Sequence, residues 1–218
     1  MTGRGGGTTR ASKGAAPADP RRFTDKRTGD SVVKVFQGDF YVTTDPGEIL
    51  SCVLGSCVSA CLRDPVAGVG GMNHFLLPYR GADGSDSGLS DDDLAAARSR
   101  YGNHAMAYLI RRLIAFGARR DRLEAKVFGG GRVLGREGRV GELNAAFVEE
   151  YLASEGIAVL ASSLRGAQPV MIRYKPVDGN AWVRRVQPEE TPRVAERESR
   201  RRVRLHKDTE SGRVEAYD

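Results

Sequence analysis

Short runs of β-branched and aromatic residues, separated by turn signals, recur along the first third of the chain and predict β-strands. SVVKVF (31–36) and DFYVTT (39–44) are divided by the turn residues QGD. EILSCVLGSCVSACL (48–62) is expected to form a strand, a turn and a strand, and AGVGGMNHFLLP (67–78) a further strand that stops at Pro78. Later runs with the same character are LEAKVF, IAVLASS, PVMIRYK and NAWVRRV, the last two joined around VDGN, whose Asp-Gly pair favours a tight hairpin.

Two other segments place their apolar residues at helical spacing. Ser90 precedes three aspartates, which is the acidic first turn typical of a helix start, and Gly117 and Gly156 are positioned to end the two helices. The predicted apolar faces are Ala105, Leu109, Leu113 and Phe116 in the first helix and Leu143, Phe147, Val148, Tyr151 and Leu152 in the second. About eight strands, mostly joined as hairpins, and two main helices predict an α+β fold, a layered, sheet-rich single domain.

The two ends of the chain differ in composition from this central part. Residues 1–30 are rich in Gly and basic residues and lack a period, so they are expected to form a disordered basic arm. Residues 189–218 mix acidic and basic residues with few apolar ones and are expected to form a charged tail. The domain is therefore predicted to span residues 31–188, with a mobile surface loop at YRGADGSDSGLSDDD (79–93).

Charge and hydropathy narrow the classes of function. The formal net charge is +6, but the arm at residues 1–30 contributes most of it, and no basic stripe with interleaved aromatics occurs in the domain. A nucleic-acid partner is therefore not predicted. The sequence has no run of about 18 apolar residues and no apolar segment in its first thirty, so neither membrane insertion nor export is predicted. Three cysteines make no disulfide framework, and the expected location is the cytoplasm.

The three cysteines lie within ten residues, at Cys52, Cys57 and Cys61. They form no C-x-x-C pair and have no second cluster, so a zinc or redox site is not predicted. Cys52 and Cys61 are interpreted as small buried hydrophobes. Cys57 follows a Gly-Ser turn directly, and backbone N–H groups of such a turn can converge near the sulfur, as an oxyanion site requires. A nucleophilic thiol also needs a neighbouring base.

His74 is the candidate base. His206 lies in the charged tail and His104 in the first predicted helix, where a surface position is expected, whereas His74 lies in the strand that follows the Cys57 strand. The two strands would be hairpin neighbours, so a Cys–His pair is available. On spacing alone, a core histidine beside a buried cysteine remains the alternative. A hydroxyl or amide could orient the imidazole, with Ser51, Thr43, Thr44 and Asn73 as candidates.

Taken together, these segments resemble a known family. DFYVTTDPGEILSCVLGSCVSACLRDPVAGVGGMNHFLLP (39–78), AMAYLIRRLIAFGA, LEAKVFGGGRVL, GELNAAFV and GIAVLASSLRG are similar to the CheD family of chemoreceptor glutamine deamidases, over about residues 33–187. The resemblance implies a catalytic cysteine at Cys57 and a catalytic histidine at His74. The family's third member is usually a threonine, and here that position is Ser51. The fold implied is similar to that of the cytotoxic necrotizing factor-type cysteine hydrolases.

What the resemblance implies is hydrolysis of glutamine side chains of methyl-accepting chemotaxis receptors to glutamate and ammonia, through a cysteine thioester and without a cofactor or metal. Family members often bind a CheC-type phosphatase, which is the second expected partner. Two stretches depart from the family pattern, namely SLRGAQP (163–169), where many relatives have a Gly-Gly pair, and GGG (129–131), which replaces a more usual Gly-Gly-Ala.

Two other functions compete with the deamidase. One is a non-catalytic chemotaxis adaptor that binds receptors or a CheC-type phosphatase through the same fold. The other is nucleotide binding by FGGGRVLGREGRVGELN (128–144) ahead of a helix. This stretch lacks a Gly-Lys-Ser/Thr ending, and we therefore expect it to be a flexible loop.

Overall fold

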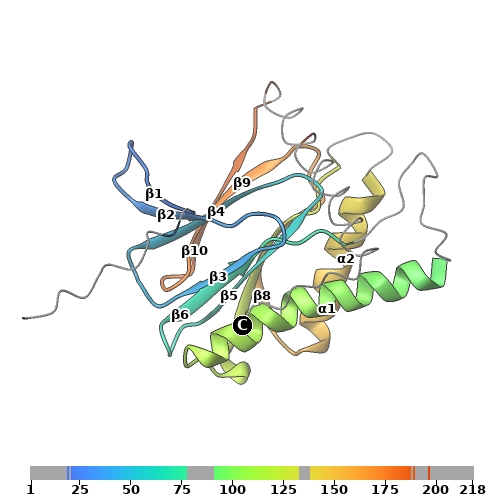
Figure 1. The fold of residues 1–218 in the computed structure, drawn as a ribbon, viewed down its shortest axis with the longest axis horizontal. Coiled ribbons are helices and arrows are strands. Elements are labelled where there is room, and N and C mark those ends of the chain that lie inside the picture. Colours follow the sequence, from blue (N-terminus) through green and yellow to red (C-terminus); the bar gives the residue numbers. More distant parts are fainter. Residues whose placement is uncertain are drawn as a thin grey trace, which may run out of the picture.

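The computed structural model describes residues 21–77, 91–132 and 138–187, together with Asp19, Glu189 and Glu196. It contains two five-stranded sheets and two long helices (Figure 1). The first sheet has the spatial order β1-β2-β4-β9-β10, and the second has the order β3-β6-β5-β7-β8. No helix in this part of the chain is long and apolar enough to cross a membrane.

The first sheet is mixed, with β2 and β4 running parallel and its other pairs antiparallel. β9 and β10 form the hairpin that the Asp-Gly turn predicts, with Asn180 opposite Lys175. The strands of this sheet are β1 (Arg22–Thr24), β2 (Ser31–Lys34), β4 (Glu48–Leu54), β9 (Val170–Lys175) and β10 (Asn180–Arg185).

The second sheet carries the candidate residues. β5 lies at its centre and pairs antiparallel with β6 on one side and with β7 on the other, and β8 runs parallel to β7 at the edge. The strands are β3 (Phe40–Thr43), β5 (Val58–Asp64), β6 (Val69–Asn73), β7 (Glu124–Gly129) and β8 (Ala158–Leu164).

Two hydrophobic clusters, one on each face of the second sheet, make the domain three layers thick. The inner cluster lies between the two sheets and includes Leu50, Cys52 and Ile172 from the first and Cys61 and Met72 from the second. The outer cluster lies between the second sheet and the helices. It is built on Val58, Ala60, Leu62, Phe75, Met106, Leu109, Val148 and Leu152. Successive residues of β5 therefore alternate between the two clusters, as the pleat of a strand requires.

The two helices cover the outer face of the second sheet. α1 (Asp91–Ala115) packs on β3, β5 and β6, and α2 (Gly138–Ser154) packs on β5, β7 and β8 (Figure 1). A short 3-10 turn, η1 (Arg120–Arg122), follows α1. Gly117 and Gly156 lie just beyond the helix ends at φ of 99° and 66°, the left-handed conformation of a helix cap.

Most of the predicted elements are confirmed, including the α+β class, the two helices and the hairpin order. Phe116 is an exception, because it is 41% exposed rather than part of the core. The predicted arm also extends too far. β1 lies within residues 1–30, and Asp25 and Asp30 form ion pairs with Arg173 at 2.6 and 3.0 Å. The predicted mobile loop, apart from the start of α1, and nearly all of the charged tail lie outside the described residues.

Candidate active site

Cys57 directly precedes β5, where the pairing between β5 and the chain after β6 ends. Val58 and Phe75 exchange two backbone hydrogen bonds, at 3.0 and 2.9 Å, and form an isolated bridge beyond the regular ladder. In this register Cys57 faces Leu76, and His74 faces Ser59. Cys57 and His74 are therefore diagonal cross-strand neighbours rather than directly opposite residues. Such pairs are roughly 7–8 Å apart between Cα atoms, within reach of long side chains.

Both side chains point to the same face of the second sheet. Cys57 and Leu76 belong to the inner cluster, whereas Val58 and Phe75 belong to the outer one. The alternation along β6 therefore directs His74 inward as well. Cys57 is fully buried and His74 is 6% exposed. The register thus places the predicted pair on one face of the second sheet, and both side chains are buried.

The His74 ring is held by the chain that follows β2. Its Nδ1 lies 3.2 Å from the Val35 carbonyl oxygen. The His74 backbone is fixed by the same connection, because its N–H donates to Asp39 O at 3.0 Å and its carbonyl accepts from Gly38 N at 2.7 Å. A carbonyl can only accept, so Nδ1 carries the proton in this arrangement. The lone pair then resides on Nε2, the nitrogen that can act as a base.

The Ser51 hydroxyl lies elsewhere. It donates to Ile172 O at 2.9 Å. Ser51 pairs with Arg173 and alternates with Leu50 and Cys52, so its side chain is on the solvent face of the first sheet, away from the inner cluster. Its backbone carbonyl accepts from Val35 N at 2.9 Å. No contact in the described part of the chain joins the Ser51 hydroxyl to His74, and its predicted role in orienting the ring stays a prediction.

The other candidate orienters also have partners away from the ring. The Thr43 hydroxyl accepts from Asp45 N at 2.9 Å. The Asn73 amide accepts from Ala60 N at 2.9 Å and donates toward α1. His104 is exposed on α1, as expected, with its ring 5.1 Å from that of Tyr108. The Val35 carbonyl was missed by the sequence analysis, since a backbone group leaves no signal in residue type.

Three hydrogen bonds to backbone carbonyls fix the turn before β5. Gly55 O accepts from Gly131 N at 2.8 Å, and Cys57 O accepts from Gly130 N at 2.7 Å. Between them, Ser56 O accepts from the side-chain amide of Asn144 at 2.8 Å. In a trans peptide the C=O and the following N–H point in opposite directions. Binding of the Gly55 and Ser56 carbonyls therefore sets the directions of the Ser56 and Cys57 N–H groups.

The glycine run that follows β7 packs directly on this turn. Gly129 has φ of 102°, and a Cβ on it would overlap the Cys57 carbonyl oxygen. Only glycine allows that approach. The expectation that FGGGRVLGREGRVGELN (128–144) is a flexible loop is wrong for its first part. That part is instead a wall of the candidate site, while residues 133–137 lie outside the described chain.

Cys52 and Cys61 have the environment predicted for packing residues. Both are buried in the inner cluster. Burial raises the pKa of the Cys52 thiol to about 12 and raises the pKa of Cys61 well above its ordinary value. Such thiols stay protonated at neutral pH and are poor nucleophiles.

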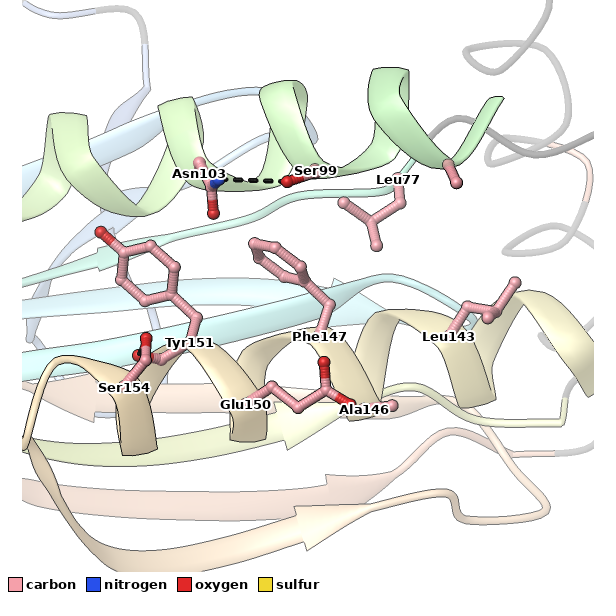
Figure 2. A pocket seen from close by; sticks show the side chains of 10 residues that line it. Leu77, Ser99, Asn103, Leu143, Ala146, Phe147, Glu150, Tyr151 and Ser154 are labelled. Carbon is pink, nitrogen blue, oxygen red and sulfur yellow. Dashed lines mark hydrogen bonds between the residues drawn. The ribbon is translucent and has the colours of Figure 1, made fainter. Parts of the chain in front are cut away.

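A groove of about 450 Å³ between α1 and α2 lies on the opposite side of the second sheet. Figure 2 shows Phe147 and Tyr151 projecting from α2 toward α1, with Leu77 at the base of the groove. Leu77 and Phe147 belong to the outer cluster, whereas Cys57 belongs to the inner one. This groove is therefore separate from the candidate active site.

Comparison with known proteins identifies the family. A model described as "CheD chemotactic sensory transduction" matches residues 85–185. A protein of Rhodopseudomonas palustris is 47% identical over 173 residues, covering 79% of this chain and 78% of its own. The chain belongs to the CheD family. A Vibrio vulnificus relative is 41% identical over 191 residues, covering 88% of each chain. Both relatives are named "Probable chemoreceptor glutamine deamidase CheD".

The CheD match includes the candidate site. The family model begins at residue 85, beyond Cys57 and His74. The alignment with the Vibrio relative leaves only about 27 of the 218 residues outside it, so it must span residues 51–74 wherever it begins. A Sinorhizobium medicae relative with the same name is 52% identical over 149 residues, covering 68% of this chain and 77% of its own.

Proposed function

We propose that this CheD family member is a cysteine-dependent protein-glutamine deamidase that acts on methyl-accepting chemotaxis receptors. The observation that carries the proposal is the placement of Cys57 and His74 on one face of two neighbouring strands, with the turn before Cys57 fixed through its carbonyls. A thiol, a base with a defined tautomer and directed backbone N–H groups are the parts that acyl transfer requires.

The reaction follows from these parts. His74 Nε2 takes the proton of the Cys57 thiol, and the thiolate attacks the side-chain carboxamide carbon of a receptor glutamine. The oxygen of that carboxamide becomes negative and is stabilised by the N–H groups of the turn. The imidazolium gives its proton to the nitrogen, which leaves as ammonia, so that a thioester remains. His74 then takes a proton from water, and the hydroxide attacks the thioester carbon. The C–S bond breaks, glutamate is released, and the imidazolium returns its proton to the sulfur.

The Val35 carbonyl supports the base in both steps. It keeps the proton on Nδ1 and so keeps Nε2 available. Ser51 contributes to this arrangement through its backbone, because its carbonyl holds the Val35 N–H. We therefore assign Ser51 an indirect role, in which the position of its main chain matters more than its hydroxyl.

The resemblance to the CheD family supports the setting that we propose for the reaction. Receptor glutamines are the substrate, the reaction takes place in the cytoplasm, and a CheC-type phosphatase is the expected regulatory partner. No cofactor or metal takes part in the steps above.

The test is mass spectrometry of receptor peptides after incubation with the full-length protein. Wild type should produce ammonia and the mass gain of a glutamine-to-glutamate change, and Cys57→Ala and His74→Ala should abolish both. Cys61→Ala is the matched control, since it removes a thiol from the same strand and the same cluster. Turnover by either Cys57→Ala or His74→Ala at the wild-type rate would refute the mechanism.

Full burial of Cys57 favours one second candidate, the non-catalytic adaptor, because a binding protein needs no access to the sulfur. Complementation distinguishes the two functions. If Cys57→Ala restores chemotaxis in a strain that lacks the protein, the adaptor is correct. If only proteins with an intact Cys57 restore it, the deamidase is correct.

A further inference from the structure

Asn144 is a polar residue on the buried face of α2. It lies one turn before Val148 and two before Leu152 on the same apolar face, and it is fully buried. Both ends of its side chain are used, because Nδ2 donates to Ser56 O at 2.8 Å and Oδ1 accepts from Leu77 N at 2.9 Å. Burial of an amide costs free energy unless its hydrogen bonds are made, and here two backbone groups supply them.

These two backbone groups occupy matching positions in the β5–β6 register. Hydrogen-bonded pairs of an antiparallel ladder recur every second residue, so the pair that follows Val58–Phe75 outward would be Ser56–Leu77. In a continuous ladder Leu77 N would donate directly to Ser56 O. The Asn144 amide is inserted between them and makes both bonds. The amide thus bridges residues 56 and 77, one position outward from the Cys57–Leu76 pair.

The neighbour on the other side of Cys57 is also irregular. In a regular antiparallel pair, Gly130 would both donate to Cys57 and accept from it. Gly130 donates to the Cys57 carbonyl at 2.7 Å, but it has φ of 61°, and a Cβ at Gly141 of α2 would contact its carbonyl oxygen. The chain on both sides of Cys57 thus leaves regular strand geometry, and α2 packs against it each time.

We propose that Asn144 is a positioning residue for the oxyanion site of Cys57. By holding the Ser56 carbonyl toward α2, it fixes the plane of the Ser56–Cys57 peptide and aims the Cys57 N–H in the opposite direction, at the oxygen of the tetrahedral intermediate. By bonding both Ser56 and Leu77, it takes the place of the direct backbone hydrogen bond that would extend the ladder beside the thiol. The inference rests on the proposed function, because it gives these backbone groups a part in acyl transfer.

The test compares two reactions of the same sulfur. Acylation of Cys57 by p-nitrophenyl acetate passes through an oxyanion, whereas alkylation by iodoacetamide does not. The ratio of the acylation rate constant to the alkylation rate constant measures the stabilisation of the oxyanion. Changes in the thiolate fraction of Cys57 or in access to it affect both rate constants and therefore cancel in the ratio. Modification at Cys57 is followed by peptide mass spectrometry with Cys57→Ala as the background, and urea-unfolded protein gives the ratio without a site.

In native wild type, the ratio should exceed that of unfolded protein. Asn144→Ala should lower it by about 10²-fold, the order expected when an oxyanion donor is lost or misplaced by an ångström. Asn144→Asp keeps the volume and the acceptor for Leu77 N but turns an oxygen toward the Ser56 carbonyl, so it should give the same loss. If Asn144→Ala fails to fold, the isosteric Asp variant decides.

Val148→Ala is the matched control, because it truncates a fully buried side chain on the same face of α2 without touching the turn. It should lower the melting temperature and leave the ratio unchanged. A wild-type ratio equal to that of unfolded protein, or an unchanged ratio in both Asn144 variants, would overturn the inference. On the receptor, the variants should lower kcat with KM within about twofold. Absence of receptor turnover by wild type, with the ratio effects intact, would instead refute only the proposed substrate.

Discussion

The two ends of strand β5 use backbone amides in opposite ways. At its end, the buried Asp64 carboxylate collects the N–H groups of Val66, Ala67 and Arg119 at 2.8–3.0 Å and pairs with Arg122 at 2.7 Å. At its start, the carbonyls of the turn are the bound groups, and the N–H groups are directed elsewhere. One end therefore holds a permanent anion, whereas the other, in the mechanism we propose, receives an anion only during the reaction.

The comparison teaches that burial alone does not distinguish a structural polar site from a reactive one. Cys57, directly before β5, and Asp64, at its end, are both fully buried. At Asp64 the chain itself supplies a charged acceptor, the carboxylate, and the group contributes stability. At the turn before β5 the chain supplies donors to the carbonyls, and the proposed mechanism assigns the turn N–H groups to the oxyanion formed from the substrate.

The largest expected effect is on receptor deamidation, where substitution of Cys57 and substitution of Asp64 should give different results. Cys57→Ala should lower receptor deamidation by on the order of 10⁴-fold or more, because the nucleophile is lost. Asp64→Asn, assayed well below its melting temperature, should stay within a few-fold of wild type. Ammonia release measures both. Comparable losses in the two variants would mean that the ends of β5 are not functionally distinct.

The next largest effect is expected in the alkylation of the three cysteine thiols. At pH 8 a thiol with the pKa of Cys52, about 12, is ionised to roughly one part in 10⁴. Iodoacetamide should therefore label Cys57 in the native protein and leave Cys52 and Cys61 unlabelled, whereas all three should react in urea. Peptide mass spectrometry reads the labelling. Equal labelling of Cys57 and Cys61 in the folded state would remove the distinction between them.

The free energy of unfolding should depend on Asp64, at the opposite end of β5 from Cys57. Burial would raise the pKa of Asp64, but hydrogen bonds from the Arg119 and Ala67 N–H groups and from Arg122 lower it to about 2. A folded pKa below the unfolded value of 3.8 gives stability that is fully present above about pH 4 and is lost as the pH falls through 2. The contribution is about 2 kcal/mol.

Urea unfolding at several pH values tests this contribution. Asp64→Asn should be less stable than wild type at pH 7, and the difference should shrink as the pH falls from 4 toward 2. Cys57→Ala should show the wild-type pH dependence. A difference between Asp64→Asn and wild type that stays constant down to pH 2 would contradict the assignment.

The smallest effect is expected at Ser51. Ser51→Ala loses one hydrogen bond to Ile172 O, which costs about 1 kcal/mol of stability, and should leave kcat within about twofold. Ser51→Thr restores the hydroxyl and serves as the control. A tenfold lower kcat in the Ala variant with recovery in the Thr variant would show that the hydroxyl acts on His74 directly.

Much of the fold could be predicted from the sequence because local patterns encode it. Runs of β-branched and aromatic residues between turn residues predicted every described strand except β1 at nearly its observed position. The spacing of Leu109, Leu113, Val148 and Leu152 predicted two buried helix faces. β1 was missed because its three residues are exposed and flanked by polar sequence, so their pairing depends on contacts with β2 and on ion pairs to β9. Asn144 did leave a signal, as a polar residue at a buried helix position.

The sequence by itself determined which residue types are available, a thiol behind a Gly-Ser turn and a histidine on the next strand, together with the order of the strands. Only the tertiary structure decided how the site is built. The Val35 carbonyl reaches His74, the glycine run closes on the Cys57 carbonyl, and Asn144 enters the ladder between Ser56 and Leu77. The physical reason is that these contacts are made by or with the backbone, which is the same at every position, so only three-dimensional packing selects the groups that meet.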